Sequence, residues 1–76
     1  MSVIGDAIIY FRRVKNISQN ELAAAVGIQR PILSHIETGK VDPSFELGRK
    51  IAIALDVTLP ELGVKAPGFE KKNIEV

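Results

Sequence analysis

Apolar residues recur at three- and four-residue spacing along most of the chain, which is the pattern of short helices packed around one core. In the first segment they stand at Ile4, Ile8 and Phe11, and predict a helix from residue 2 or 3 to about residue 15. Glycine, proline and capping residues divide residues 18–62 into four more segments. The pattern therefore predicts an all-α fold, a compact bundle of five short helices.

The second segment carries both a start and a stop signal. In "SQNE", Ser18 can accept a hydrogen bond from the amide of Glu21 while the Glu21 carboxylate reaches back to the amide of Ser18. Gly27 ends the segment, because glycine most easily adopts the left-handed conformation that follows a last helical turn. We expect this helix to span residues 19–26.

Three further helices follow. The third is expected over residues 30–37, with Pro31 in its first turn, where a missing amide hydrogen does little harm. Ser44 can cap the fourth helix, and "TLPE" predicts a fifth helix of one or two turns with a capping box formed by Thr58 and Glu61. The inward side chains expected on the fourth helix are Phe45, Leu47, Ile51, Ala52 and Leu55.

Residues 1–64 are expected to form the folded domain and residues 65–76 a C-terminal tail. The tail, "KAPGFEKKNIEV", has no helical period and contains a Pro67-Gly68 turn signal. The tail carries Phe69, Ile74 and Val76 in an otherwise charged stretch, and a small domain gains from burying apolar surface against a partner. The tail therefore either contributes to dimerisation through Phe69 or is an ordinary disordered terminus.

Composition narrows the possible classes of protein. The chain has 76 residues, no cysteine, one histidine and a formal net charge of +1. A lack of cysteine excludes disulfides, thiolate metal sites and a cysteine nucleophile. No apolar run approaches the roughly 20 residues of a membrane span, and the basic residues near the start follow the apolar stretch, unlike those of a signal peptide. We expect a cytoplasmic protein with no metal, cofactor or small-molecule effector.

The joint between the second and third helices is the most informative feature. Only residues 27–29 separate them, and so short a connection around a glycine makes two helices cross steeply. Here the chain resembles the helix-turn-helix family of the lambda repressor and Cro, also called the Xre type, from about Ile4 to Leu62. The segments "SHIETGK" and "DPSFELGRKIAIAL" are also similar to the family's. The resemblance implies a DNA-binding domain whose third helix reads bases.

The outward face of the third helix is the expected reading surface. Leu33 and Ile36 point to the core, so the opposite side fits the major groove of DNA. Arg30 can make two hydrogen bonds to guanine and Gln29 two to adenine, although Gln29 is a weak helix cap. Ile32 either touches a thymine methyl group or closes the edge of the core. The expected base contacts are Gln29, Arg30, Pro31, Ile32, Ser34 and His35; the alternative is a solvated helix face.

Phosphate contacts are expected from neighbouring segments, because they position a protein on DNA without reading sequence. Gln19 opens the second helix, where the family's equivalent glutamine binds the DNA backbone. The loop after the third helix can offer backbone amides and a cation. The expected set is Gln19, Thr38, Gly39, Lys40 and, less specifically, Arg13. A basic edge of Arg30, His35 and Lys40 would let a nearly neutral domain bind DNA.

Arg12 lies on the buried stripe of the first helix, so its guanidinium needs a partner. Glu37 is the candidate, and in the resembling family an Arg and a Glu at these two positions pair. The alternative is two independent surface charges. If the pair forms, it fixes the angle between the reading helix and the first helix, and serves specificity more than stability.

These residues predict a sequence-specific DNA-binding protein, a small repressor or autoregulator that binds a palindromic operator as a homodimer. Family relatives pair through the fifth helix and nearby loops, which here implies Pro43, Phe45, Val57, Leu59, Leu62 and Phe69. An antitoxin or restriction-modification controller of the same fold is an alternative. So is a helical protein-interaction module that uses either the tail or apolar residues expected near the surface, namely Ile9, Tyr10, Val14 and Ile53. With one histidine and no carboxylate cluster or phosphate loop, no catalytic residues are expected.

Overall fold

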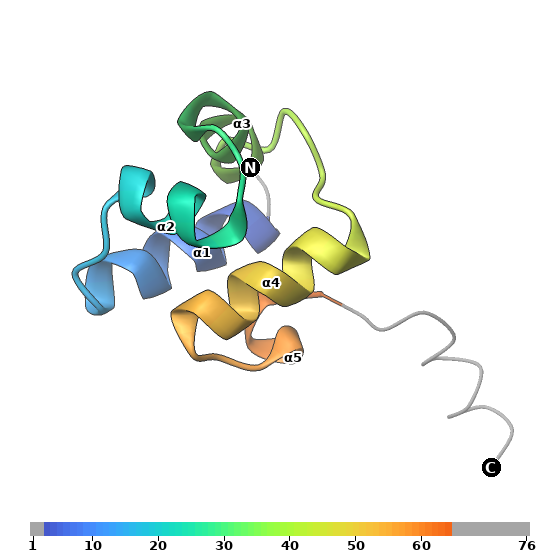
Figure 1. Cartoon of the computed structure of the whole chain (residues 1–76). Coiled ribbons are helices and arrows are strands. Elements are labelled where there is room, and N and C mark those ends of the chain that lie inside the picture. The colour runs from blue at the N-terminus through green and yellow to red at the C-terminus, as the bar shows by residue number, and fades with distance from the viewer. Residues whose placement is uncertain (1–2, 65–76) are drawn as a thin grey trace, which may run out of the picture.

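The computed structural model describes residues 3–64 and contains five helices in this range (Figure 1). Their bounds are α1 Val3–Val14, α2 Gln19–Val26, α3 Arg30–Glu37, α4 Phe45–Leu55 and α5 Leu59–Leu62. The predicted all-α bundle is confirmed, and the predicted second and third helices have the bounds expected from sequence. No helix in the described part of the chain has both the length and the apolar character required to cross a membrane.

Polar caps define the ends of α2. The Ser18 hydroxyl accepts a hydrogen bond from the amide of Glu21 at 3.0 Å, and the Glu21 carboxylate accepts one from the amide of Ser18 at 2.8 Å. Gly27 follows with a left-handed φ of 79°, and its amide donates to carbonyls of the last turn. Because both ends are satisfied locally, α2 has a fixed length and α3 starts at a fixed distance from it.

One core holds the five helices together, and each helix contributes to it. Its largest fully buried side chains are Ile8, Leu22, Leu33, Ile36, Ile51, Leu55 and Leu62. Two expected inward residues of α4, Phe45 and Leu47, are only half-buried. In Figure 1, α1 lies between α3 and α5, and it contacts both. Helix α3 therefore rests on α1 and α2, on the side of α1 away from α5.

Gly5 lets α1 approach the C-terminal end of α3 closely. The residue is buried, and a Cβ atom at this position would lie 2.7 Å from the carbonyl oxygen of Ile36 and closer still to that of Glu37. Real Cβ atoms do not come so near to backbone oxygens, so no side chain fits here without separating the helices. Glycine at this position therefore sets the distance between α1 and α3.

The capping box of α5 makes the protein sensitive to acid at one exposed carboxylate. Hydrogen bonds from the backbone amide and then the hydroxyl of Thr58, with a smaller contribution from the charge of Lys15, lower the pKa of Glu61 below its ordinary 4.5. A lowered pKa in the folded state stabilises the protein above pH 4.5, and this contribution is lost as the pH falls through the folded-state value.

We therefore expect Glu61→Gln to lose less stability than the wild type when the pH is lowered below 4.5. Urea unfolding of both proteins between neutral and acidic pH measures the difference. Thr58→Val keeps the backbone hydrogen bond but removes that of the hydroxyl, and should give an intermediate result. Parallel stability profiles for wild type and Glu61→Gln would contradict the assignment.

Candidate nucleic-acid interface

The turn between α2 and α3 presents the first residues of α3 to solvent. Gly27 reverses the chain in its left-handed conformation, and Gln29 precedes α3 with an extended backbone. The Gln29 side chain makes no capping hydrogen bond, in agreement with its weak capping ability. Its amide group is therefore free to act outward, beside Arg30 and Pro31 at the start of the helix.

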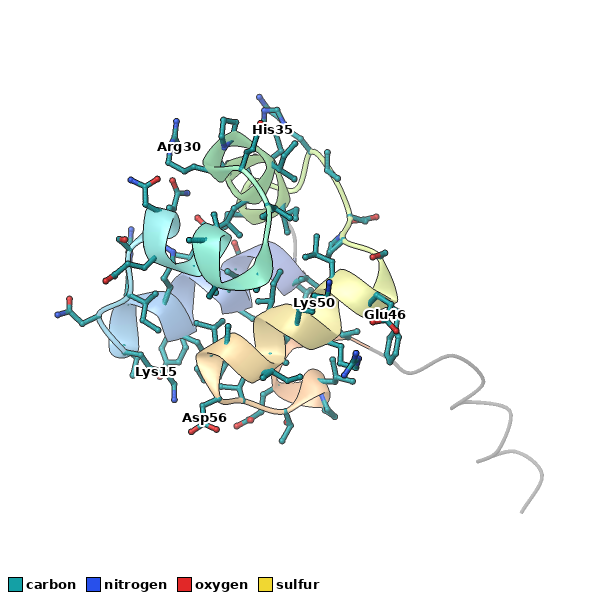
Figure 2. All side chains as sticks on the ribbon, viewed as in Figure 1. Lys15, Arg30, His35, Glu46, Lys50 and Asp56 are labelled. Atoms are coloured by element: carbon teal, nitrogen blue, oxygen red, sulfur yellow. The ribbon has the colours of Figure 1, made fainter. Side chains whose placement is uncertain are left out.

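The two sides of α3 differ sharply. Leu33, Ile36 and Glu37 are buried, whereas Ser34 is half-buried. The remaining expected base-contact residues are exposed: Gln29, Arg30, Pro31, Ile32 and His35. Figure 2 shows Arg30 and His35 projecting from the same end of the molecule. The structure thus brings the expected base-contact residues together on and beside one surface of α3, with Ile32 at its rim and 42% exposed.

Arg12 and Glu37 form an ion pair beneath this surface. The Arg12 Nε donates to Glu37 Oε2 at 2.9 Å and a second guanidinium nitrogen donates to Oε1 at 3.3 Å. Arg12 also donates to the carbonyl of Ile17 at 3.1 Å. The side chains of Arg12 and Glu37 are only 15% and 3% exposed. The pair therefore connects α1 directly to the last turn of α3, away from solvent.

Gln19 extends this ion pair to the reading surface. Its Nε2 donates to Glu37 Oε1 at 2.8 Å, and its Oε1 accepts a hydrogen bond from Arg30 at 3.4 Å, which is long. One buried carboxylate is thus shared by residues of α1 and α2, and Arg30 is tied to it through Gln19. Sequence reasoning placed Gln19 among the phosphate contacts and missed both hydrogen bonds. Its position at the start of α2 gave no sign that it would face Glu37.

The loop after α3 differs from expectation in its backbone. The amides of Thr38, Gly39, Lys40 and Val41 all donate to carbonyl oxygens of α3, at 2.9–3.3 Å. The Thr38 hydroxyl also donates to the carbonyl of Ser34 at 3.1 Å. We expected this loop to offer free amides to a phosphate, and that expectation was wrong. These amides already donate hydrogen bonds to the last carbonyl oxygens of α3. The exposed ammonium group of Lys40 remains available.

Charge on the surface of α3 is one-sided. Its only acidic residue, Glu37, is buried and paired, so the exposed charged group on the helix is that of Arg30, with His35 and Lys40 following. Asp56 and Glu46 lie on other parts of the molecule in Figure 2. Arg13 is exposed on α1, about 100° around the helix from Arg12. Among residues 3–64, no three histidine or carboxylate side chains are grouped as a metal site would require.

The expected dimer residues are only partly available. Four of them are half-buried. Pro43 and Phe45 lie at the start of α4, Val57 lies between α4 and α5, and Leu59 begins α5. Leu62 was wrongly expected at the interface: it is 0% exposed, because α5 turns it into the core of its own chain. Phe69 and the other residues of 65–76 lie outside the described range.

Comparison with known proteins agrees with this geometry. The Helix-turn-helix family model matches residues 8–62. An uncharacterized HTH-type transcriptional regulator of Methanocaldococcus jannaschii is 38% identical over 53 residues, which cover 70% of this chain and 80% of the relative. The HTH-type transcriptional regulator SlrR of Bacillus subtilis is 38% identical over 61 residues, 79% of this chain and 40% of that protein.

A phage protein is similar too. The ImmF control region 10 kDa protein of Bacillus phage phi105 is 40% identical over 48 residues, which cover 63% of this chain and 53% of the phage protein. The family match runs from within α1 to the end of α5. It therefore includes α2, the turn that follows it, α3 and most of α1, on which α3 packs. The resemblance drawn from the sequence is confirmed: the chain belongs to the helix-turn-helix family of the Xre and Cro type.

Proposed function

We propose that this protein is a sequence-specific DNA-binding transcription regulator that acts in the cytoplasm as a repressor or autoregulator, and binds a palindromic operator as a homodimer. The observation that carries the proposal is the exposed side of α3, which has polar and cationic residues at its N-terminal end and no exposed acid. A helix presented in this way fits the major groove of B-DNA. The names of the similar regulators support the same role.

Base reading is assigned to the first turn of α3. Arg30 offers two parallel hydrogen bonds to guanine, and Gln29, free of any capping bond, offers two to adenine. Ser34 is half-buried and His35 lies one turn beyond Ile32, so both contact DNA further along the groove. Pro31 and Ile32 contribute shape and apolar contact. The hydrogen bond that Arg30 donates to the Gln19 Oε1 holds Arg30 near the start of α2, where a phosphate would also lie.

Positioning on the DNA backbone is assigned to Lys40, Gln19 and Arg13. Lys40 follows α3 directly and is exposed, so its ammonium can neutralise a phosphate beside the groove. Such a contact strengthens binding to every sequence alike.

Arg30→Ala should weaken binding to the operator by about 1–3 kcal/mol and relax the choice of base at one position of each half-site. Lys40→Ala should weaken binding to all sequences and reduce the salt slope by about one unit. Operators are obtained by selecting duplexes from a random pool, and affinities are measured on operator and random DNA over a range of salt. Lys50→Ala, an exposed lysine on α4 away from α3, is the control and should leave both unchanged (Figure 2).

Equal losses on operator and random DNA for Arg30→Ala would remove Arg30 from the base-reading set. Wild-type binding without salt dependence would reject the DNA-binding proposal itself, because phosphate neutralisation always releases counterions. That second result would favour the alternative of a helical protein-interaction module.

The operator dimer is assigned to Pro43, Phe45, Val57 and Leu59, with Phe69 of the tail. A chain ending at Val64 should fold but dimerise more weakly, because a buried phenylalanine ring contributes about 1.5–3 kcal/mol per chain. Sedimentation equilibrium of the full and shortened chains measures this difference. Equal dimer constants would exclude the tail and leave the ends of α4 and the start of α5 as the interface.

A further inference from the structure

One side of α1 is apolar and largely exposed in the described structure, although Ala7 on this side also packs against the core. Val3, Tyr10 and Val14 are 77%, 61% and 62% exposed, and half-buried Ala7 lies among them. The four residues are spaced by four, three and four, so they form a continuous line along the helix, which we call the α1 stripe. This spacing is that of a two-helix seam, in which apolar residues alternate every three and four positions.

The α1 stripe faces away from the reading helix. Gly5 and Arg12 contact α3, and at 100° per residue they lie about 180° around α1 from the stripe. A partner bound to the stripe would therefore not touch DNA bound to α3. Neither the proposed base contacts nor the proposed operator-dimer residues belong to the stripe.

The α1 stripe is complementary to itself when two copies of α1 run antiparallel. When the midpoints of the two helices are aligned, Val3 of one copy lies against Val14 of the other, and Ala7 lies against Tyr10. The Tyr10 ring of each copy then packs against Ala7, the smallest side chain of the stripe, and this match of sizes allows close packing. A two-fold axis repeats both contacts, so every apolar residue of the stripe is covered at once.

Charges beside the α1 stripe obey the same symmetry. Asp6 and Arg13 are exposed on one flank of the stripe, seven residues apart, and neither has an ion-pair partner among residues 3–64. In an antiparallel pair this flank meets its own copy with the order reversed. Asp6 of each copy then faces Arg13 of the other, which gives two ion pairs.

We propose that the α1 stripe binds a second copy of this chain, antiparallel and across a two-fold axis. The two α3 helices then point away from each other, so the pair joins two separate DNA segments and is distinct from the operator dimer. The helix is only about 18 Å long, and the association is correspondingly weak, with a dissociation constant of about 0.1–1 mM. High local concentration on DNA favours it.

A charge swap tests the arrangement. Sedimentation equilibrium of the full chain, up to about 1 mM, compares wild type with Asp6→Arg, Arg13→Asp and the double variant. Each single change sets like charges opposite one another twice and should lower the association constant about fivefold or more, whereas the double variant should return to within about twofold of wild type. The proposed operator dimer, which forms through residues near α4 and α5, involves neither Asp6 nor Arg13. Its contribution should therefore be the same in all four proteins.

The apolar part of the α1 stripe is tested by Val14→Ser, which should lower the association constant about tenfold or more. Ile53→Ser, an equally exposed apolar residue on α4 (66%), should have no effect on this association. Each variant's thermal unfolding shows that it is folded. A wild type that is monomeric through this range, four equal constants, or a double variant no better than the single ones would overturn the proposal.

A second readout separates this proposal from DNA binding. Wild-type protein should co-precipitate a labelled duplex with a second, immobilised duplex, and Asp6→Arg should lose this bridging while it binds single duplexes like wild type. In the paired state Arg13 faces Asp6 of the other copy, so its proposed phosphate contact belongs to the unpaired protein. The double variant restores association but not that phosphate contact. Failure to bind any duplex would reject the proposed function and leave the sedimentation result unaffected.

Discussion

Glu37→Ala is expected to lower the free energy of unfolding by about 3–5 kcal/mol. The substitution leaves Arg12, whose side chain is only 15% exposed, without a carboxylate, and also removes the acceptor of the Gln19 amide. Removing one partner of a buried pair costs far more than the net contribution of the pair, because the remaining charge has been taken out of water. Urea unfolding at neutral pH measures the effect.

The matched control replaces both partners. Arg12→Met with Glu37→Met removes both buried charges and keeps apolar volume, so it should be much more stable than Glu37→Ala. Operator affinity should nevertheless fall in the double variant, since Gln19 and Arg30 lose the carboxylate that orients them. A Glu37→Ala protein within about 1 kcal/mol of wild type would show that the pair is solvated in solution.

Gly5→Ala is expected to lower the free energy of unfolding by about 3 kcal/mol, the upper part of the range for overpacking. Alanine has the higher helix propensity, by about 1 kcal/mol, but the added methyl group meets backbone oxygens of α3 that cannot rotate away. The clash therefore outweighs the propensity gain. Thermal and urea unfolding measure the loss.

Gly48→Ala on α4 is the control for this substitution. Its Cβ would lie 3.3 Å from a methyl group of Val64, a side chain that can shift, so the change should be close to neutral. If Gly5→Ala were as stable as Gly48→Ala, α1 and α3 would be less tightly packed than the structure shows.

Local signals in the sequence predicted most of the fold. Ser18, Glu21 and Gly27 fix the ends of α2 through contacts within four or five residues, so their effect could be derived without knowing the tertiary structure. The third helix followed from Pro31 and from the spacing of Leu33 and Ile36 in the same way. The outward side of α3 is a geometric consequence of that spacing.

Contacts between distant residues were predicted less well. Arg12 and Glu37, 25 residues apart, were paired because the family resemblance supplied their positions, whereas the Gln19 hydrogen bonds depend on rotamers that no spacing encodes. Leu62 was placed at a dimer interface because family relatives pair through this helix, and the direction of a one-turn helix cannot be derived from its own four residues. Gly5 did carry a signal: a glycine on the buried stripe of a helix marks close packing.

The division of α3 into a buried side and an exposed side has a consequence for how such a protein diverges. Substitutions at exposed helix positions usually change stability by no more than about 0.5 kcal/mol, so Gln29, Ile32 and His35 can be exchanged without disturbing the core. If α3 reads bases as proposed, single substitutions that leave folding stability unchanged can alter the DNA sequence that the protein recognises. Arg30 differs from these residues, because it also donates a long hydrogen bond to Gln19, which in turn binds the buried Glu37.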